Sequence, residues 1–162
     1  MLLKFFLNSN STAYLRGLEA EFGDSTNAIR LELNRFEKAG MLESFQEGNK
    51  KFFKANTTHP LYTDIHHILL KYIGFDRIVD TILSNIGDIQ KVYVTGSFAK
   101  GLDDEIIHIV LVGKVNISYL NTLIEKTKGI ISRSISYEIL SLEECNDKKT
   151  FFEQDAFLLW ET

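Results

Sequence analysis

Residues 92–113 read VYVTGSFAKGLDDEIIHIVLVG, and this stretch decides the fold of the C-terminal half of the chain. It opens with β-branched and aromatic residues at 92–94, turns at Gly96 and Ser97, and continues into a second β-rich run over 106–112. β-branched and aromatic residues favour strands, and Gly-Ser pairs favour turns. The pattern therefore predicts two strands joined across a glycine-containing turn.

The same stretch resembles the signature of the DNA polymerase beta-like nucleotidyltransferase superfamily, in its minimal form. The resemblance implies that the turn of Gly96 and Ser97, together with Lys100, holds nucleotide phosphates. Successive backbone N–H groups in such a turn can bind an anion without a metal. We therefore expect a vestigial phosphate site at these three residues, with a nucleotide or another small anion as a possible effector.

The resemblance also implies an Asp-x-Asp pair on the second strand, which would hold the catalytic magnesium ions. In this sequence the two positions fall on Ile106 and His108, and the family's third carboxylate aligns with Ser136. Magnesium prefers carboxylate and water oxygens, whereas a neutral imidazole suits zinc, copper or iron. We therefore expect a domain that lacks catalytic activity, a metal site and a bound cofactor.

Upstream of these strands the sequence predicts helices followed by a hairpin. A helix over 12–22 ends at Gly23, and a further helix capped by Ser25 ends at Gly40. Two strands, 41–46 and 51–54, follow across the turn Glu47-Gly48-Asn49.

Residues 12–58 resemble the ArsR-like winged helix-turn-helix family, and the resemblance is carried by the run STNAIRLELNRFEKAGMLESFQEGNKKFFKANTTHPLY, which starts at Ser25. That resemblance implies double-stranded DNA as the partner, with the start of the recognition helix meeting base edges in the major groove. Asn and Arg suit adenine and guanine, and lysines in the wing suit phosphates. The expected DNA-binding residues are Ser25, Thr26, Asn27, Arg30, Lys50 and Lys51.

The single proline, Pro60, suggests a boundary because the residue before a proline avoids helical geometry. Helices are predicted at 61–73, 75–86 and 116–128, and further strands at 134–140 and 155–160. We expect an α+β chain: a winged helix-turn-helix domain followed by a small nucleotidyltransferase-like α/β domain with a mixed sheet. The expected divisions are a winged-helix domain (1–60), connecting helices (61–88) and a nucleotidyltransferase-like domain (89–162).

Composition narrows the class of protein further. Net charge is −4, but residues 1–60 hold eight Lys/Arg against seven Asp/Glu, whereas 61–162 hold ten against fifteen. The asymmetry favours the N-terminal part as the surface that meets a polyanion. A single cysteine, Cys145, excludes an internal disulfide. No secretory signal or apolar run of membrane-spanning length is present, so we expect a cytoplasmic protein with no membrane partner.

These patterns together predict a DNA-binding transcriptional regulator. Because few phosphates are neutralised by one copy, we expect a homodimer, with the C-terminal domain serving dimerisation or ligand sensing. Two alternatives stay open. The chain could be an active nucleotidyltransferase that uses Asp103, Asp104 or Glu138 as atypical metal ligands, or an antitoxin-like module whose winged helix contacts protein.

Overall fold

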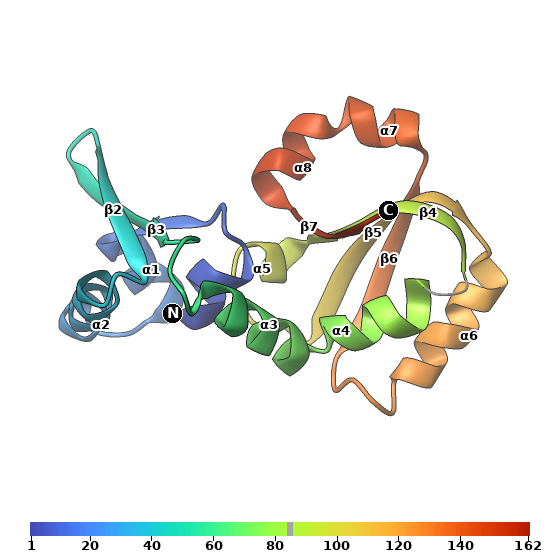
Figure 1. Ribbon diagram of the computed structural model, residues 1–162, viewed down its shortest axis with the longest axis horizontal. Helices are drawn as coiled ribbons and strands as arrows, with labels where there is room; N and C mark the ends of the chain where they lie inside the picture. Colours follow the sequence, from blue (N-terminus) through green and yellow to red (C-terminus); the bar gives the residue numbers. More distant parts are fainter. Residues whose placement is uncertain (84–85) are drawn as a thin grey trace.

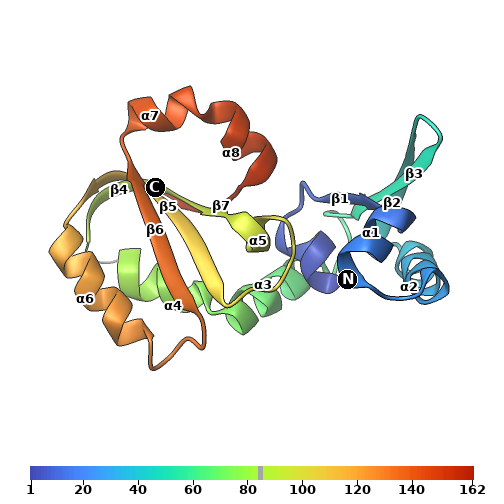
Figure 2. The ribbon, with the colours of Figure 1, turned by 180° about the vertical axis from the view of Figure 1, so that it is seen from behind.

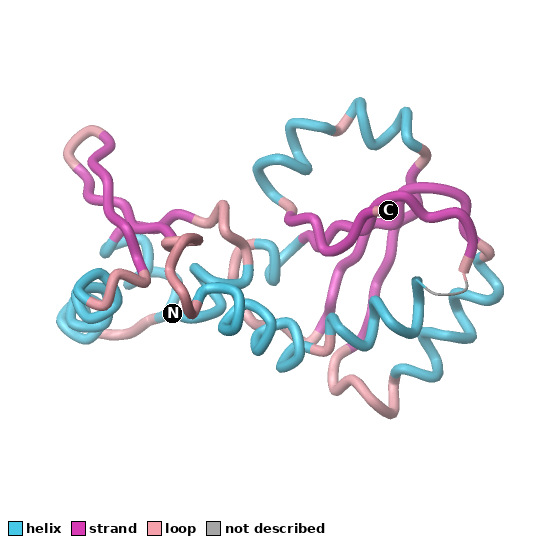
Figure 3. The backbone as a smooth tube through the Cα atoms, in the orientation of Figure 1, coloured by secondary structure: helices cyan, strands magenta, loops and turns pink. Residues whose placement is uncertain are grey.

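The computed structural model describes residues 1–83 and 86–162, which form an α+β protein with one sheet at each end (Figure 1, Figure 3). The N-terminal sheet has the strand order β1-β3-β2, and the C-terminal sheet has the order β6-β5-β4-β7. In the second sheet β5 and β6 are parallel, whereas the other neighbouring strands are antiparallel. The fold class predicted from the sequence, α+β with a mixed sheet, is confirmed.

The N-terminal elements follow the order of a winged helix-turn-helix. Gly23, with a φ of 69°, ends the first helix of the motif, and the Ser25 side chain accepts a hydrogen bond from the N–H of Ala28 at 3.2 Å to cap the second. The elements are η1 (Leu3–Leu7, a short π-helical segment), β1 (Thr12–Tyr14), α1 (Leu15–Phe22), α2 (Thr26–Lys38), β2 (Leu42–Glu47) and β3 (Lys50–Ala55).

One helix boundary predicted from the sequence was wrong. Residues 12–14 do not begin a helix but form strand β1, which pairs antiparallel with β3 through contacts such as Ala13 opposite Phe53. The β3 edge lies about forty residues away along the chain, so local periodicity carries no signal for this pairing. As a consequence, the start of α1 lies beside the hairpin.

Two short helical segments and a longer helix connect the two sheets. Helix α3 (Tyr62–Ile73) ends at Gly74, whose φ of 101° turns the chain into α4 (Phe75–Ile78) and η2 (Val79–Leu83). The predicted helix over 75–86 begins as expected. Its residues 84 and 85 lie outside the described residues.

The C-terminal sheet is covered by helices on both faces, as the front and back views show (Figure 1, Figure 2). Helices α4 and α6 lie on one face, and α7 and α8 lie on the other. The sequence did not predict α7 and α8. The elements are β4 (Gly87–Thr95), α5 (Gly96–Ala99), β5 (Ile106–Val115), α6 (Ile117–Thr127), β6 (Ser134–Leu140), α7 (Leu142–Asp147), α8 (Lys149–Asp155) and β7 (Phe157–Glu161).

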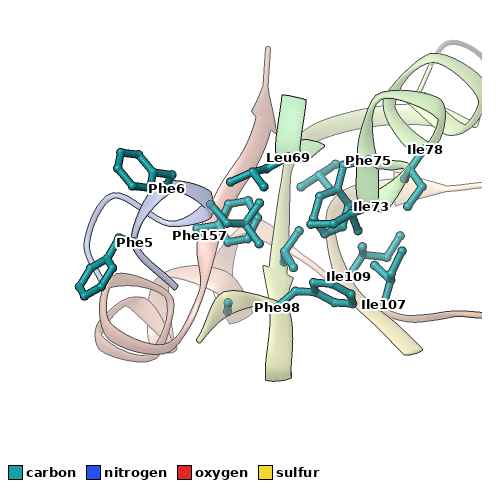
Figure 4. Close-up of a cluster of buried hydrophobic side chains, with 14 of the residues drawn as sticks. Phe5, Phe6, Leu69, Ile73, Phe75, Ile78, Phe98, Ile107, Ile109 and Phe157 are labelled. Atoms are coloured by element: carbon teal, nitrogen blue, oxygen red, sulfur yellow. The ribbon is translucent and has the colours of Figure 1, made fainter. Parts of the chain in front are cut away.

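A single cluster of buried hydrophobic side chains continues from the winged helix into the C-terminal sheet (Figure 4). Phe5 and Phe6 of η1 are at most 1% exposed and belong to this cluster. At its other end the Phe75 ring contacts the rings of Phe98 and Phe157, with centroids 5.8 and 5.9 Å away. Because the core is continuous, the division at residues 60 and 88 stays a prediction.

Polar contacts hold η1 against the loop that follows α5. Lys4 Nζ donates to the carbonyl oxygen of Lys100 at 3.1 Å and pairs with Glu21 of α1 at 2.9 Å. Asn8 Nδ2 donates to the carbonyl oxygen of Ala99 at 2.9 Å, and Asn8 is buried. The glycine-serine turn is therefore joined directly to the winged helix.

Across residues 1–83 and 86–162, no helix combines the length and the apolar character needed to cross a membrane.

A substitution at Gly101 tests the contact between η1 and the loop after α5, because Gly101 has left-handed backbone geometry and no room for a side chain. Its φ is 73°, and an added Cβ would lie 2.3 Å from Lys4 Cα. Gly48 has a similar φ of 61° with nothing within 4 Å of an added Cβ, so Gly48→Ala should cost only the backbone term, about 1–2 kcal/mol. Gly101→Ala should lower the free energy of unfolding by at least about 2 kcal/mol more.

Urea unfolding of the full chain, followed by circular dichroism, measures both variants. Equal losses of stability in Gly48→Ala and Gly101→Ala would contradict the close approach of η1 to this loop.

Candidate nucleic-acid interface and the glycine-serine turn

A basic groove of about 550 Å³ lies between α2 and the β2–β3 hairpin, at the end of the molecule away from the C-terminal sheet (Figure 1). Four of its lining side chains are cationic, and none that the structure describes there is acidic. The lining residues are Tyr14, Leu15, Arg16, Arg30, Leu33, Asn34, Asn49, Lys50, Lys51 and Phe53.

The structure brings some of the expected DNA-binding residues together and leaves others apart. Arg30 of α2 shares the groove with Lys50 and Lys51 of the hairpin. Ser25, Thr26 and Asn27 lie at the N-terminal end of the same helix, outside the groove lining. The Ser25 oxygen already accepts the capping hydrogen bond, so toward a ligand it can act mainly as a donor.

The two lysines of the hairpin, Lys50 and Lys51, differ in whether their charge is already paired within the chain. Lys51 Nζ lies 2.9 Å from Glu37 Oε2, and hydrogen bonds from Ser44 first and Lys51 second lower the pKa of the Glu37 carboxyl. The ammonium of Lys51 therefore already has a carboxylate partner within the chain. Lys50 Nζ lies 4.4 Å from the centre of the Tyr14 ring, a cation–π contact that positions the ammonium without removing its charge.

Arg16 is a groove residue that sequence reasoning missed. It is the second residue of α1, and the pairing of β1 with β3 places the start of α1 beside the wing. In the described part of the chain, Arg16, Arg30 and Lys50 make no ion pair, so three charges remain free to meet an anion.

The second candidate site is the turn between β4 and β5, and its backbone frame matches the expectation from the sequence. Gly96 has a φ of 70°, and a Cβ there would lie 2.9 Å from His108 Cδ2. His108 is opposite Thr95 on β4 and opposite Ser136 on β6. The turn is therefore adjacent to His108 and Ser136, two of the positions where the sequence resemblance implies carboxylates. Neither side chain is acidic, nor is that of the exposed Ile106, the third such position.

The hydroxyl group of Ser97 in the turn is already hydrogen-bonded to a carboxylate of the same chain. Ser97 Oγ donates to Asp104 Oδ2 at 2.6 Å, and the N–H of Glu105 donates to Asp104 Oδ1 at 2.7 Å. The bond from Ser97 is the largest cause that lowers the pKa of the Asp104 carboxyl, followed by the backbone N–H groups of Ile106 and Glu105. Asp104 is thus a stable anion beside Ser97 and repels a phosphate there. Lys100 is exposed.

Arg133 anchors the acidic loop to the rest of the protein. Its guanidinium binds both carboxylate oxygens of Asp103, at 2.9 and 3.1 Å, and Nε donates to the carbonyl oxygen of Asp104 at 3.2 Å. The same group lies near the carbonyl oxygens of Tyr72 and Ile73, at 3.5 and 3.4 Å. The Arg133 side chain is only 12% exposed, so this network ties the loop to the end of α3.

The acidic residues are not gathered into a metal site. Glu138 pairs with Lys148 at 3.0 Å and lies opposite Val110, two residues along β6 from Ser136. Asp103 is held by Arg133 and Asp104 by Ser97. Among the residues that the structure describes, no three His, Cys, Asp or Glu side chains are close enough to hold a metal ion.

Comparisons with known proteins give only distant likenesses. No family model and no curated protein matches the chain. One partly similar solved structure is the toxin–antitoxin MntA-HpeT, 18% identical over 54% of this chain and 73% of that chain, with a TM-score of 0.40. Another is a possible transcriptional regulator for arsenical resistance, 21% identical over 49% and 80%, with a TM-score of 0.31.

A third solved structure holds a tri-AMPylated Shewanella oneidensis HEPN toxin in complex with MNT antitoxin. The matching chain is 16% identical over 57% of this chain and 73% of its own length, with a TM-score of 0.38. At these TM-scores the likenesses assign neither a family nor an activity to this chain.

The bond between Ser97 and Asp104 predicts a pH effect. Because the folded-state pKa of Asp104 is lowered, its stabilisation is fully present above its unfolded-state pKa, near ~3.9. That stabilisation is lost as the pH falls through the folded-state pKa. Ser97→Ala should therefore raise the pKa of Asp104 toward its ordinary value and weaken the loss of stability below about pH 4.

Carbon-13 NMR titration of the aspartate carboxyl groups measures this pKa. Ser44→Ala is the matched control, since it removes the hydrogen bond that the Ser44 hydroxyl donates to the Glu37 carboxylate and leaves Asp104 untouched. An Asp104 midpoint that is the same in the wild type and in Ser97→Ala would contradict the assigned bond.

Proposed function

We propose that the chain is a DNA-binding transcriptional regulator whose winged helix binds a duplex through the basic groove. This proposal is supported mainly by one observation. Three different elements place Arg16, Arg30 and Lys50 in one groove, and no described lining residue is acidic. A protein of net charge −4 that gathers cations in this way concentrates its attraction for a polyanion at one place.

The proposed roles follow from the chemistry of each side chain. Arg30 and Asn34 lie on α2, where a bidentate guanidinium suits guanine and an amide suits adenine. Arg16 and Lys50 flank the helix and suit phosphate oxygens, which fix the register of the protein on the duplex. Asn27, near the start of α2, is proposed to meet a base edge, and Ser25 and Thr26 a phosphate.

We further propose that the nucleotidyltransferase-like part performs no nucleotidyl transfer. Two-metal phosphoryl transfer needs carboxylates that hold both ions. Ile106, His108 and Ser136 stand at the expected positions, and the nearby Asp103 and Asp104 are bound to Arg133 and Ser97. This arrangement favours a structural or sensing role over catalysis.

DNA selection followed by variant binding tests the proposed function. Purified protein would select fragments of random-sequence duplex, and affinity for an enriched fragment would be measured by fluorescence anisotropy. Arg30→Ala should weaken binding to that fragment about 5- to 150-fold, the usual cost of a lost bidentate base contact.

Arg35→Ala is the matched control, because Arg35 lies on the same helix outside the groove and pairs with Glu32 at 2.6 Å. It should bind the fragment as the wild type does. Selection that enriches no fragment, or equal losses in Arg30→Ala and Arg35→Ala, would overturn the assignment of the groove.

Lys50 should act through phosphate and not through base identity. Lys50→Ala is expected to weaken binding to enriched and unrelated duplexes by the same factor, and to reduce the slope of log affinity against log salt by about 1. Titrations of both duplexes over a range of salt concentrations measure this. A loss confined to the enriched duplex would contradict the phosphate role.

A further inference from the structure

Helix α3 crosses between the two ends of the molecule (Figure 1, Figure 2). Exposed apolar side chains form a stripe along this helix. Leu61, just before the helix, is 51% exposed, Ile68 is 63% exposed and Tyr72 is 64% exposed. At 100° per residue these positions fall within about 40° of one another around the helix axis. Ile130, in the loop after α6, is 62% exposed and joins the C-terminal end of this α3 stripe.

The α3 stripe has a charged margin with opposite signs at its two ends. Asp64 lies in the first turn of α3 and Lys71 in the last, and both are exposed on the same side of the stripe. Neither makes an ion pair within the described part of the chain. A second helix laid antiparallel, with its centre near His67 and Ile68, would place its Lys71 beside Asp64 and its Asp64 beside Lys71.

The apolar residues repeat the same symmetry. The exposed side chains of Tyr72 and Ile130 lie together at the C-terminal end of α3, beside a shallow cavity of about 360 Å³ whose walls also carry the charged Lys71, Asp76 and Arg77. In the antiparallel arrangement, Leu61 of the second helix falls at this end, next to Tyr72 and Ile130. An exposed leucine at one end and exposed apolar side chains at the other give the self-complementary pattern that a two-fold interface requires.

We propose that the α3 stripe is the surface through which a second copy of this chain binds, with the two α3 helices antiparallel about a two-fold axis near Ile68. This inference rests on the proposed function, since a dimer would present two α2 helices to a symmetric DNA site. The segment η1 cannot contribute, because Phe5, Phe6 and Leu7 are already buried within their own chain. Twelve residues of helix span about 18 Å, so a dimer of moderate affinity is expected.

Charge reversal on the full chain tests the pairing of the two copies. Analytical ultracentrifugation should detect a dimer of the wild type. Asp64→Lys and Lys71→Asp should each weaken dimerisation at least about tenfold, because each places like charges together at both ends of the interface. The double variant Asp64→Lys/Lys71→Asp restores opposite charges and should recover wild-type dimerisation.

Ile68→Asp should abolish the dimer, because it puts two carboxylates near the axis. Leu31→Asp is its control, since Leu31 is 58% exposed on α2, away from the stripe, and should leave dimerisation unchanged. Circular dichroism of each variant establishes that it folds. A wild type that stays monomeric up to about 100 µM, or a double variant that dimerises no better than the single ones, would overturn the proposal.

DNA binding separates this proposal from the proposed function. A monomeric wild type that still binds an enriched duplex would sink the dimer interface alone. A charge-sensitive dimer that binds no duplex would uphold the interface and sink the DNA-binding role.

Discussion

Insertion of the N-terminal segment between the two sheets is the contact on which the rest of the structure depends. Phe5 and Phe6 extend the core of the winged helix toward the C-terminal sheet, while Lys4 and Asn8 bind the carbonyl oxygens of two successive residues, Lys100 and Ala99, at the end of α5. These carbonyls follow the turn of Gly96 and Ser97, and the ammonium of Lys4 also pairs with Glu21 of α1. Lys4 therefore connects this turn to a helix that lines the basic groove.

The polar side chains around the turn between β4 and β5 have partners within the chain. Ser97 donates to Asp104, and Arg133 fastens Asp103 to the end of α3. A site for two-metal phosphoryl transfer needs carboxylates that are free to hold the metal ions. Here the contacts connect the loop between α5 and β5 to the end of α3.

The parts of the structure governed by local chemistry were predictable from the sequence, and those that depend on distant contacts were not. Gly23 and Ser25 end and begin helices, as glycine and serine commonly do at those positions. The strand at residues 12–14 and the place of Arg16 in the groove depend on pairing with β3, which periodicity does not reveal. Helix α7 was missed although its capping box from Ser141 to Glu144 was readable.

The most direct test of the central claim is amide hydrogen exchange of the full protein, with and without duplex DNA at low salt. Exchange should slow on DNA binding at residues 15–16, 26–34 and 49–51, which form the groove and the start of its helix. Exchange over 96–108, the glycine-serine turn and the strand after it, should show no direct protection. Protection confined to 96–108, or none anywhere, would contradict the account.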